Sequence, residues 1–123
     1  MKVLACGSRD VDPFDSWDAF ESRLRQLSDG DVTVISGGAR GSDAIAHRVA
    51  KMLGCRTMTF RAQWERDGRA AGILRNVRML DQAPDLVLAF WDGKSRGTKH
   101  TIDEARRRGI PVEILGRPTT EET

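Results

Sequence analysis

The sequence predicts an open α/β sandwich of about five parallel strands with helices on both faces. Along its 123 residues, short apolar runs alternate with amphipathic stretches. The run over residues 85–91 is apolar almost throughout, which is typical of a parallel strand covered on both faces. The intervening stretches are long enough for right-handed crossovers between parallel strands. These observations predict one Rossmann-like sheet, and in such sheets ligands bind beyond the carboxyl ends of the strands.

The amino-terminal half predicts two strand–helix units. Residues 3–6 form the first strand, and residues 32–36 form a second strand rich in β-branched side chains. Between them, a helix begins at Pro13 with Asp12 as its cap. Its apolar residues recur at helical spacing, namely Trp17, Phe20, Leu24 and Leu27. The predicted apolar face of the second helix consists of Ile45, Val49, Met52 and Leu53.

The carboxyl-terminal half continues the alternation of strands and helices. A polar loop over residues 61–68 precedes a helix with one predicted apolar stripe. That stripe consists of Ala70, Ile73, Leu74, Val77 and Leu80. The other predicted elements are strands over 56–60, 85–91 and 111–115, and a helix over 98–108. We expect one domain over residues 1–115, followed by a polar tail over residues 116–123.

The composition excludes several broad classes of protein. The 20 Lys and Arg residues against 18 Asp and Glu residues leave a formal charge of +2, which is too small for a general nucleic-acid binder. No apolar stretch approaches the ~20 residues that span a bilayer, and the first apolar run is too short for a signal peptide. Cys6 and Cys55 fall in predicted core strands and are expected to be reduced. The sequence therefore predicts a cytoplasmic protein without a membrane segment.

Arginine is concentrated where ligands would bind. Arg supplies 16 of the 20 cationic residues, which either codon bias in a GC-rich genome or a need for planar phosphate-binding groups would explain. The predicted strand-to-helix loops each carry at least one Arg: Arg9; Arg40; Arg61, Arg66 and Arg69; and Arg96. The loops over 37–43 and 93–98 also combine glycine with hydroxyl groups ahead of a helix. Unpaired N–H groups at a helix start favour anions, so the placement favours phosphate binding over codon bias alone.

Several of these residues also fit other interpretations. Residues 37–43 could form only a tight turn with Ser42 as a helix cap, and no Lys precedes Ser42 as in a Walker loop. Residues 93–97 fit the nucleophile-elbow pattern, but the only later His is the nearby His100, which argues against a serine hydrolase. His47, His100 and the cysteines lack metal-ligand spacing, so no metal site is predicted. Trp64 and Trp91 could both be core residues or platforms for a base, and Trp91, at the end of its predicted strand, is the better candidate to stack on a base.

Four motifs occur in order along the chain. They are GSR at residues 7–9, ISGGARGSD at 35–43, GRAAGILRN at 68–76 and AFWDGKSRGT at 89–98. Over residues 1–115, this set resembles the YspA and cpYpsA-related branch of the SLOG superfamily. The resemblance implies a Rossmann-like fold that binds nucleotides or nucleotide-derived ligands. With the loop analysis, it predicts that the ligand or its phosphate is bound by Gly7, Ser8, Arg9, Gly37, Gly38, Ala39, Arg40, Gly41, Ser42, Asp43, Arg75, Asn76, Gly93, Ser95, Gly97 and Thr98.

The resemblance extends to the Lonely Guy phosphoribohydrolases, with one departure. Those enzymes carry a catalytic Arg in an Arg-Lys pair, and Arg75-Asn76 is similar, with Asn in place of Lys. Their glycine-rich motif continues to a Glu that assists glycosidic cleavage, whereas Thr101 stands at that position here. A carboxylate normally stabilises the cation-like ribose or positions water, so we expect binding without efficient hydrolysis. The remaining catalytic candidates are Arg75, Asp43, Glu65 and Asp103.

The expected function is binding or sensing of a nucleotide or nucleotide-derived phosphorylated ligand at the carboxyl edge of the sheet, with no further cofactor. A nucleotide-processing N-glycosidase is one alternative. Another alternative is an interaction with single-stranded nucleic acid like that of the DNA-processing protein DprA. Such an interaction needs a basic channel with stacking aromatic residues, and the charge of +2 with three Trp, four Phe and no Tyr disfavours it. The family analogy also predicts a homodimer or larger assembly, with Ile73, Val77 and Leu80 as a candidate face.

Overall fold

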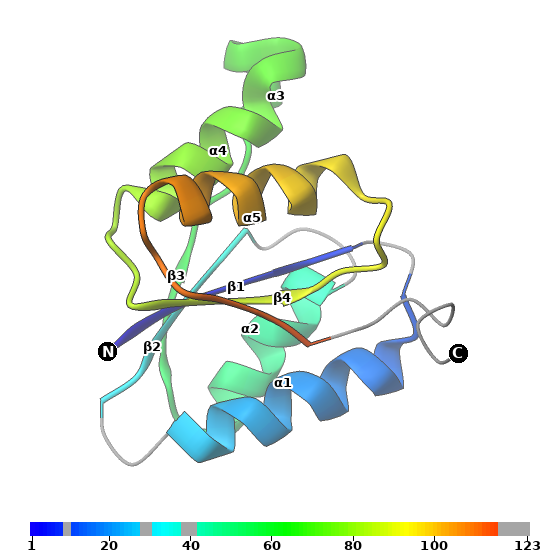
Figure 1. The fold of residues 1–123 in the computed structure, drawn as a ribbon, viewed down its shortest axis with the longest axis vertical. Helices are drawn as coiled ribbons and strands as arrows, with labels where there is room; N and C mark the ends of the chain where they lie inside the picture. Colours follow the sequence, from blue (N-terminus) through cyan, green and yellow to red (C-terminus); the bar gives the residue numbers. More distant parts are fainter. Residues whose placement is uncertain (9–10, 28–30, 38–41, 116–123) are drawn as a thin grey trace.

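The computed structural model describes residues 1–8, 11–27, 31–37 and 42–115 (Figure 1). The amino-terminal elements are β1 (Lys2–Gly7), α1 (Pro13–Leu27), β2 (Thr33–Ser36), α2 (Ser42–Met52) and β3 (Arg56–Thr59). The carboxyl-terminal elements are α3 (Trp64–Asp67), the 3-10 helix η1 (Gly68–Ala70), α4 (Ala71–Leu80), β4 (Leu86–Phe90), α5 (Arg96–Arg107) and β5 (Val112–Ile114).

The strands form one parallel sheet in the order β3-β2-β1-β4-β5. In its register, Leu4 of β1 pairs with Ile35 of β2 on one side and with Val87 of β4 on the other. The chain therefore winds outward from β1 through β2 to β3, then crosses to β4 and β5 on the opposite side. This arrangement confirms the predicted fold class, and it places the change in winding direction between β1 and β4.

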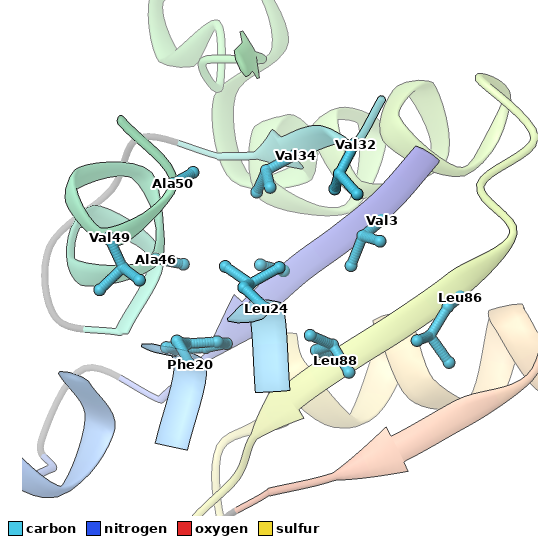
Figure 2. Packing of buried hydrophobic residues seen from close by; sticks show 11 residues of the cluster. Val3, Phe20, Leu24, Val32, Val34, Ala46, Val49, Ala50, Leu86 and Leu88 are labelled. Carbon is cyan, nitrogen blue, oxygen red and sulfur yellow. The ribbon is translucent and has the colours of Figure 1, made fainter. Parts of the chain in front are cut away.

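Helices cover both faces of the sheet. Figure 1 shows α1 and α2 on one face, with α4 and α5 on the other. In the first layer, Phe20 and Leu24 of α1 and Val49 of α2 pack with Val3 and Val34 (Figure 2). The second layer contains the neighbouring strand residues Leu4 and Ile35 with Met79, Leu80, Val87, Ile102 and Ala105. Successive strand residues point to opposite faces, so two apolar layers require almost every strand residue to be apolar.

The start of α1 confirms the predicted cap. The Asp12 side-chain oxygen Oδ1 accepts hydrogen bonds from the backbone N–H groups of Phe14 at 2.8 Å and Asp15 at 3.2 Å. These bonds satisfy donors that have no acceptor within the helix.

The predicted face of α2 was wrong in part. The helix buries Ala46, Val49 and Ala50, whereas Met52 is exposed. Small residues four positions apart let α2 approach the sheet and α1 closely, so alanine rather than the larger Met52 faces the core. Cys55 also lies just before β3 rather than within a strand; it is half-buried, and both it and the buried Cys6 are free thiols.

The segment leading into α4 differs most from the sequence prediction. The predicted polar loop contains the short helix α3, and α4 buries Ala71, Asn76, Met79 and Leu80. Ile73 and Leu74 stay 50% and 41% exposed, so the predicted apolar stripe does not all face the core. Ile73 instead lines the cleft described below.

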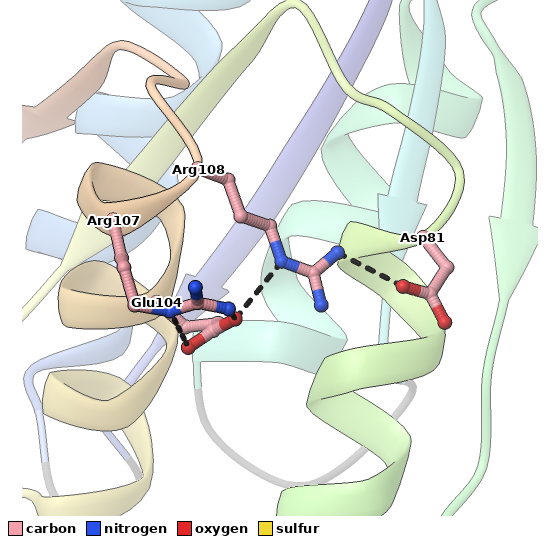
Figure 3. A network of polar contacts seen from close by, with 4 residues as sticks. All are labelled: Asp81, Glu104, Arg107 and Arg108. Carbon is pink, nitrogen blue, oxygen red and sulfur yellow. Dashed lines mark hydrogen bonds and ion pairs between the residues drawn. The ribbon is translucent and has the colours of Figure 1, made fainter.

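A cluster of ion pairs joins the carboxyl-terminal ends of α4 and α5 (Figure 3). The Arg108 guanidinium bonds to Asp81 at 2.9 Å, and to Glu104 at 3.0 Å. Arg107 also donates hydrogen bonds to Glu104. The two guanidinium groups lower the pKa of Glu104 to about 2. Arg107 and Arg108 therefore pair with carboxylates at the end of α5.

Candidate functional site: a cleft between α4 and α5

A cleft of about 670 Å³ lies at the carboxyl edge of the sheet. Its floor includes Cys6 and Gly7 at the end of β1, and its walls come from α4 and from the loop and helix that follow β4. The site is thus at the change in winding direction, where open α/β sheets bind ligands. A volume in the range of a few hundred Å³ to 1,000 Å³ suits a small molecule rather than a single ion.

Asp43 of α2 is held at one end of the cleft. Its side chain is only 7% exposed, and its Oδ1 atom accepts a 3.0 Å hydrogen bond from the Gly7 N–H. This bond joins the first turn of α2 to the end of β1. Burial raises the pKa of the neighbouring Cys6 thiol; the Asp43 carboxylate raises it further, while Arg75 acts in the opposite direction. Two opposite charges therefore lie near the cleft floor.

Arg75 of α4 is oriented by two hydrogen bonds. Its Nε atom donates to Asn76 Oδ1 at 3.0 Å, and its Nη1 atom donates to the Gly37 carbonyl at 3.3 Å. A guanidinium has five N–H groups, so others remain for a ligand. A Cβ atom added at Gly37 would lie 2.2 Å from Arg75 Nη1 and 2.9 Å from Asp43 Oδ2. Glycine at position 37 therefore gives Arg75 the space that it occupies.

Asn76 connects Arg75 to the start of α5. The side chain is buried, and its Nδ2 atom donates to the Gly97 carbonyl at 3.4 Å. Thr101 Oγ1 donates to the same carbonyl at 3.3 Å. The predicted ligand-binding residues Arg75 and Asn76 of α4 and Gly97 of α5 are thus brought together at the cleft.

The loop between β4 and α5 is braced by its own side chains. Asp92 Oδ1 accepts from the backbone N–H groups of Lys94 at 2.7 Å and Ser95 at 2.8 Å, and these bonds lower the Asp92 pKa. Ser95 Oγ caps α5 by accepting from the Thr98 N–H at 3.4 Å. Ser8 Oγ accepts from the Asp92 N–H at 3.1 Å, so this predicted ligand residue supports the loop. The first N–H groups of α5 have no acceptor within the helix and lie at the cleft.

The two tryptophan candidates have different surroundings. Trp91 packs against the second core layer, and its Nε1 atom donates to the Ser95 carbonyl at 3.1 Å. It does not line the cleft, so its placement gives no support to base stacking. Trp64 lines the cleft and is 56% exposed. Gly93 adopts φ +82° in the loop, a conformation that favours glycine, and it too lies outside the lining.

Only part of the predicted phosphate loop after β2 can be placed. Gly37 and Asp43 are described, and the backbone of Ser42 begins α2. The predicted ligand residues Arg9, Gly38, Ala39, Arg40 and Gly41 lie outside the described residues.

The catalytic candidates do not all meet at the cleft. Arg75 and Asp43 line it, whereas Glu65 and Asp103 do not. Glu65 lies on the exposed helix α3, and Asp103 pairs with Lys99 at 2.7 Å. Thr101, which stands where the Lonely Guy motif has Glu, is buried and lines the cleft. The carboxylates in the lining are therefore Asp43 and Asp92, and each accepts hydrogen bonds from backbone N–H groups.

Sequence reasoning missed several residues of the lining. Among them are Cys6, Gly72, Ile73 and His100, whereas Lys94 and Arg96 of the lining belong to the loop over 93–98 that the sequence predicted to bind phosphate. A usable signal was present on α4 and the turn before it, because Arg69, Gly72, Ile73 and Asn76 follow the spacing of one helix face. Because Ile73 is apolar, its spacing predicted a place in the core-facing stripe of the helix rather than on a ligand-binding face.

Two comparisons establish the family. A model described as the YspA, cpYpsA-related SLOG family matches residues 1–66, just over half the chain. The chain is also 43% identical to the Gene 61 protein of Mycobacterium phage D29, over 94% of this chain and 96% of that protein. The chain belongs to the YspA, cpYpsA-related SLOG family. The matched residues of the SLOG model include Gly7, Gly37 and Asp43, while the α4 and α5 walls lie beyond its carboxyl-terminal limit.

Solved structures share the fold of this SLOG protein. DNA processing protein A (DprA) from Streptococcus pneumoniae has a TM-score of 0.74 at 19% identity, covering 90% of this chain and 48% of that one. DNA processing protein A from Helicobacter pylori, described with its single-stranded DNA binding mode, has a TM-score of 0.61 at 20% identity, covering 91% and 63%. The Moco carrier protein from Chlamydomonas reinhardtii has a TM-score of 0.70 at 15% identity, covering 97% and 78%.

The chain spans about half of the first DprA chain and under two thirds of the second. At these low identities the likeness concerns the fold. Within the described ranges, no helix has the length and apolarity needed to cross a membrane. The same part of the chain holds no cluster of three His, Cys, Asp or Glu residues suited to a metal ion.

Proposed function

We propose that this SLOG protein binds a nucleotide-like phosphorylated ligand in the cleft between α4 and α5. The observation that carries the proposal is that Arg75 and the amino-terminal end of α5 line the same cleft. A guanidinium and the N–H groups at a helix start both favour an anion, and together they favour a phosphate.

The other charges of the cleft support an anionic ligand. Arg69, Lys94 and Arg96 line it, and among the described residues none of the three forms an ion pair. The acidic side chains Asp43 and Asp92 accept hydrogen bonds from backbone N–H groups, which offset part of their negative charge. The balance of available charge in the cleft is positive.

A second candidate function is cleavage of an N-glycosidic bond in the same cleft. Asp43 and Arg75 favour it because a carboxylate and a guanidinium both lie beside Gly37 and line the cleft. Thr101 in place of the Glu of the Lonely Guy motif argues against efficient hydrolysis. We therefore place binding first and treat hydrolysis as a separate measurable activity.

Calorimetric titration tests the binding proposal. The probes are the four ribonucleoside 5′-monophosphates, 3′,5′-cyclic AMP and ADP-ribose, with a short single-stranded DNA as a competitor. We expect Arg75→Ala to weaken binding of the preferred nucleotide by about 1.5–3 kcal/mol, the range for hydrogen bonds to charged groups. Arg107→Ala removes a cation on α5 that does not line the cleft, so it is the matched control.

Equal losses from the two Arg variants would show that a diffuse field, rather than this cleft, attracts the ligand. Absence of nucleotide binding, or displacement only by DNA, would contradict the proposal.

A further inference from the structure

An apolar wall lies beside the cationic part of the cleft. It consists of Trp64 on α3 and of Gly72 and Ile73 on α4, all of which line the cleft. Trp64 is 56% exposed and Ile73 is 50% exposed. We call these three residues the apolar wall.

The apolar wall is not explained by the packing of the core. None of the residues of α3 is buried, and this short helix contacts α4 and η1, projecting beyond α4 in Figure 1. Neither Trp64 nor Ile73 belongs to the two clusters of buried residues or to the side chains packed against them. Large apolar side chains that do not pack in the core are candidates for contact with a ligand.

The Trp64 ring lies close to α4, beside Gly72. A Cβ atom added at Gly72 would be 3.8 Å from Cη2 of the ring, which is ordinary van der Waals contact. The indole therefore lies above a helix surface without a side chain, and more than half of Trp64 remains open to solvent. An exposed aromatic surface of this kind suits a flat partner.

The apolar wall lies within reach of the phosphate-binding groups. Arg75 follows Gly72 by three residues on α4, which is about 4.5 Å along a helix axis and nearly the same face. One ligand can therefore contact the Trp64 ring and the Arg75 guanidinium together. The cleft, at about 670 Å³, is larger than a phosphate group alone would fill.

We propose that the apolar wall binds the base of the ligand, so that the cleft selects nucleotides over sugar phosphates. The base stacks on Trp64 and contacts Ile73, while the phosphate binds at Arg75 and the start of α5. This proposal rests on the proposed function, and it assigns the ligand class and the residues that select it. The cationic side chains beside the apolar wall favour a ligand with a flat apolar end and an anionic end over an apolar protein surface.

Affinity for two matched probes tests this assignment. The panel of nucleotides given above is titrated into the wild type beside ribose 5-phosphate, which has the sugar and the phosphate but no base. We expect at least one nucleotide to bind more tightly than ribose 5-phosphate. Trp64→Ala should weaken the affinity for that nucleotide by about 5- to 150-fold, as for loss of a base–aromatic stack, and should leave the affinity for ribose 5-phosphate unchanged.

Two variants serve as controls. Trp64→Phe retains an aromatic ring and should retain most of the nucleotide preference. Phe14→Ala removes an aromatic side chain that is 81% exposed and does not line the cleft, so it should change neither affinity. Nucleotide binding should also quench tryptophan fluorescence in the wild type, and Trp64→Phe should remove most of that quenching.

The outcomes separate this inference from the proposed function. Equal affinity of nucleotides and ribose 5-phosphate, or a nucleotide preference that survives Trp64→Ala, would overturn the base assignment and leave phosphate binding intact. If Arg75→Ala abolishes all binding while Trp64→Ala binds the nucleotide as tightly as the wild type, the base assignment is likewise overturned and phosphate binding is left intact. If the wild type binds none of the probes, the proposed function fails and the base assignment fails with it.

Discussion

The Nη1 atom of Arg75 lies 3.3 Å from the Gly37 carbonyl oxygen, at the position that a side chain on residue 37 would otherwise fill. This contact joins α4 to the loop that follows β2. It explains why a residue with no Cβ stands at the end of that strand, and it fixes the guanidinium in the cleft.

Adding a methyl group at Gly37 should displace Arg75. A Cβ atom there would lie 2.2 Å from Arg75 Nη1 and 2.8 Å from its Cζ atom, distances that real Cβ atoms do not tolerate. We expect Gly37→Ala to weaken nucleotide binding about as much as Arg75→Ala, measured by calorimetry. Gly97→Ala is the stability control, because a Cβ at Gly97 meets no heavy atom within 4 Å.

A larger side chain at Gly97 should act on the ligand alone. Gly97→Val should weaken binding while the midpoint of urea unfolding changes little, since its side chain would extend toward the open cleft. Unchanged affinity in Gly97→Val would show that the start of α5 does not contact the ligand.

The β4–α5 loop should make the folded protein less stable at acid pH. The backbone N–H groups of Lys94 and Ser95 lower the pKa of Asp92 in the folded state. The stabilisation is therefore present above the unfolded pKa, near 3.9, and is lost as the pH falls through the folded pKa. Urea unfolding of the wild type and Asp92→Asn should differ most at neutral pH and converge as the pH falls through the folded-state pKa of Asp92. A difference that grows on acidification would contradict this account of the loop.

We expect little or no release of free base from nucleoside monophosphates. In the sequence resemblance to the Lonely Guy motif, Thr101 takes the place of a Glu, and loss of one acid–base partner removes ~10²–10⁴-fold of rate. The measurement is chromatography of the four monophosphates after incubation with the wild type and with Thr101→Glu. Robust wild-type turnover that Arg75→Ala abolishes would favour the hydrolase, and Asp43→Asn would then test the carboxylate beside Arg75.

A homodimer or larger assembly stays a prediction, but the structure changes the residues of α4 that are candidates for the contact between subunits. Leu80 is 1% exposed and Ile73 lines the cleft, so of the exposed apolar residues on α4, Leu74 is the better contact. Sedimentation should give a species larger than the 13.7 kDa chain, and Leu74→Glu should shift it toward the monomer. A clean wild-type monomer at micromolar concentration would remove this prediction.

The sheet was predictable because its signals are local. Each strand is a short apolar run between turn residues, and the Asp12 cap is read from neighbouring positions. The cleft depends instead on contacts between distant segments, such as the bond from Gly7 to Asp43 and the bond from Arg75 to Gly37. No local pattern encodes those pairs.

The α4 wall was mispredicted for a related reason. Ile73 is apolar at a helical spacing, and such spacing does not distinguish a core from a ligand-binding wall. The sequence favoured Trp91, at the end of a strand, as the base-stacking residue, whereas the tertiary fold places Trp91 against the core and Trp64 at the cleft. The Gly-rich motifs nevertheless predicted the edge of the sheet at which the cleft lies, because the carboxyl ends of parallel strands meet there.

A crystal structure with the preferred nucleotide, or with phosphate, tests the central claim most directly. The account predicts the phosphate within hydrogen-bond reach of the Arg75 guanidinium and of the first backbone N–H groups of α5. Anion density confined to other surfaces, such as the Arg107 and Arg108 end of α5, would contradict it.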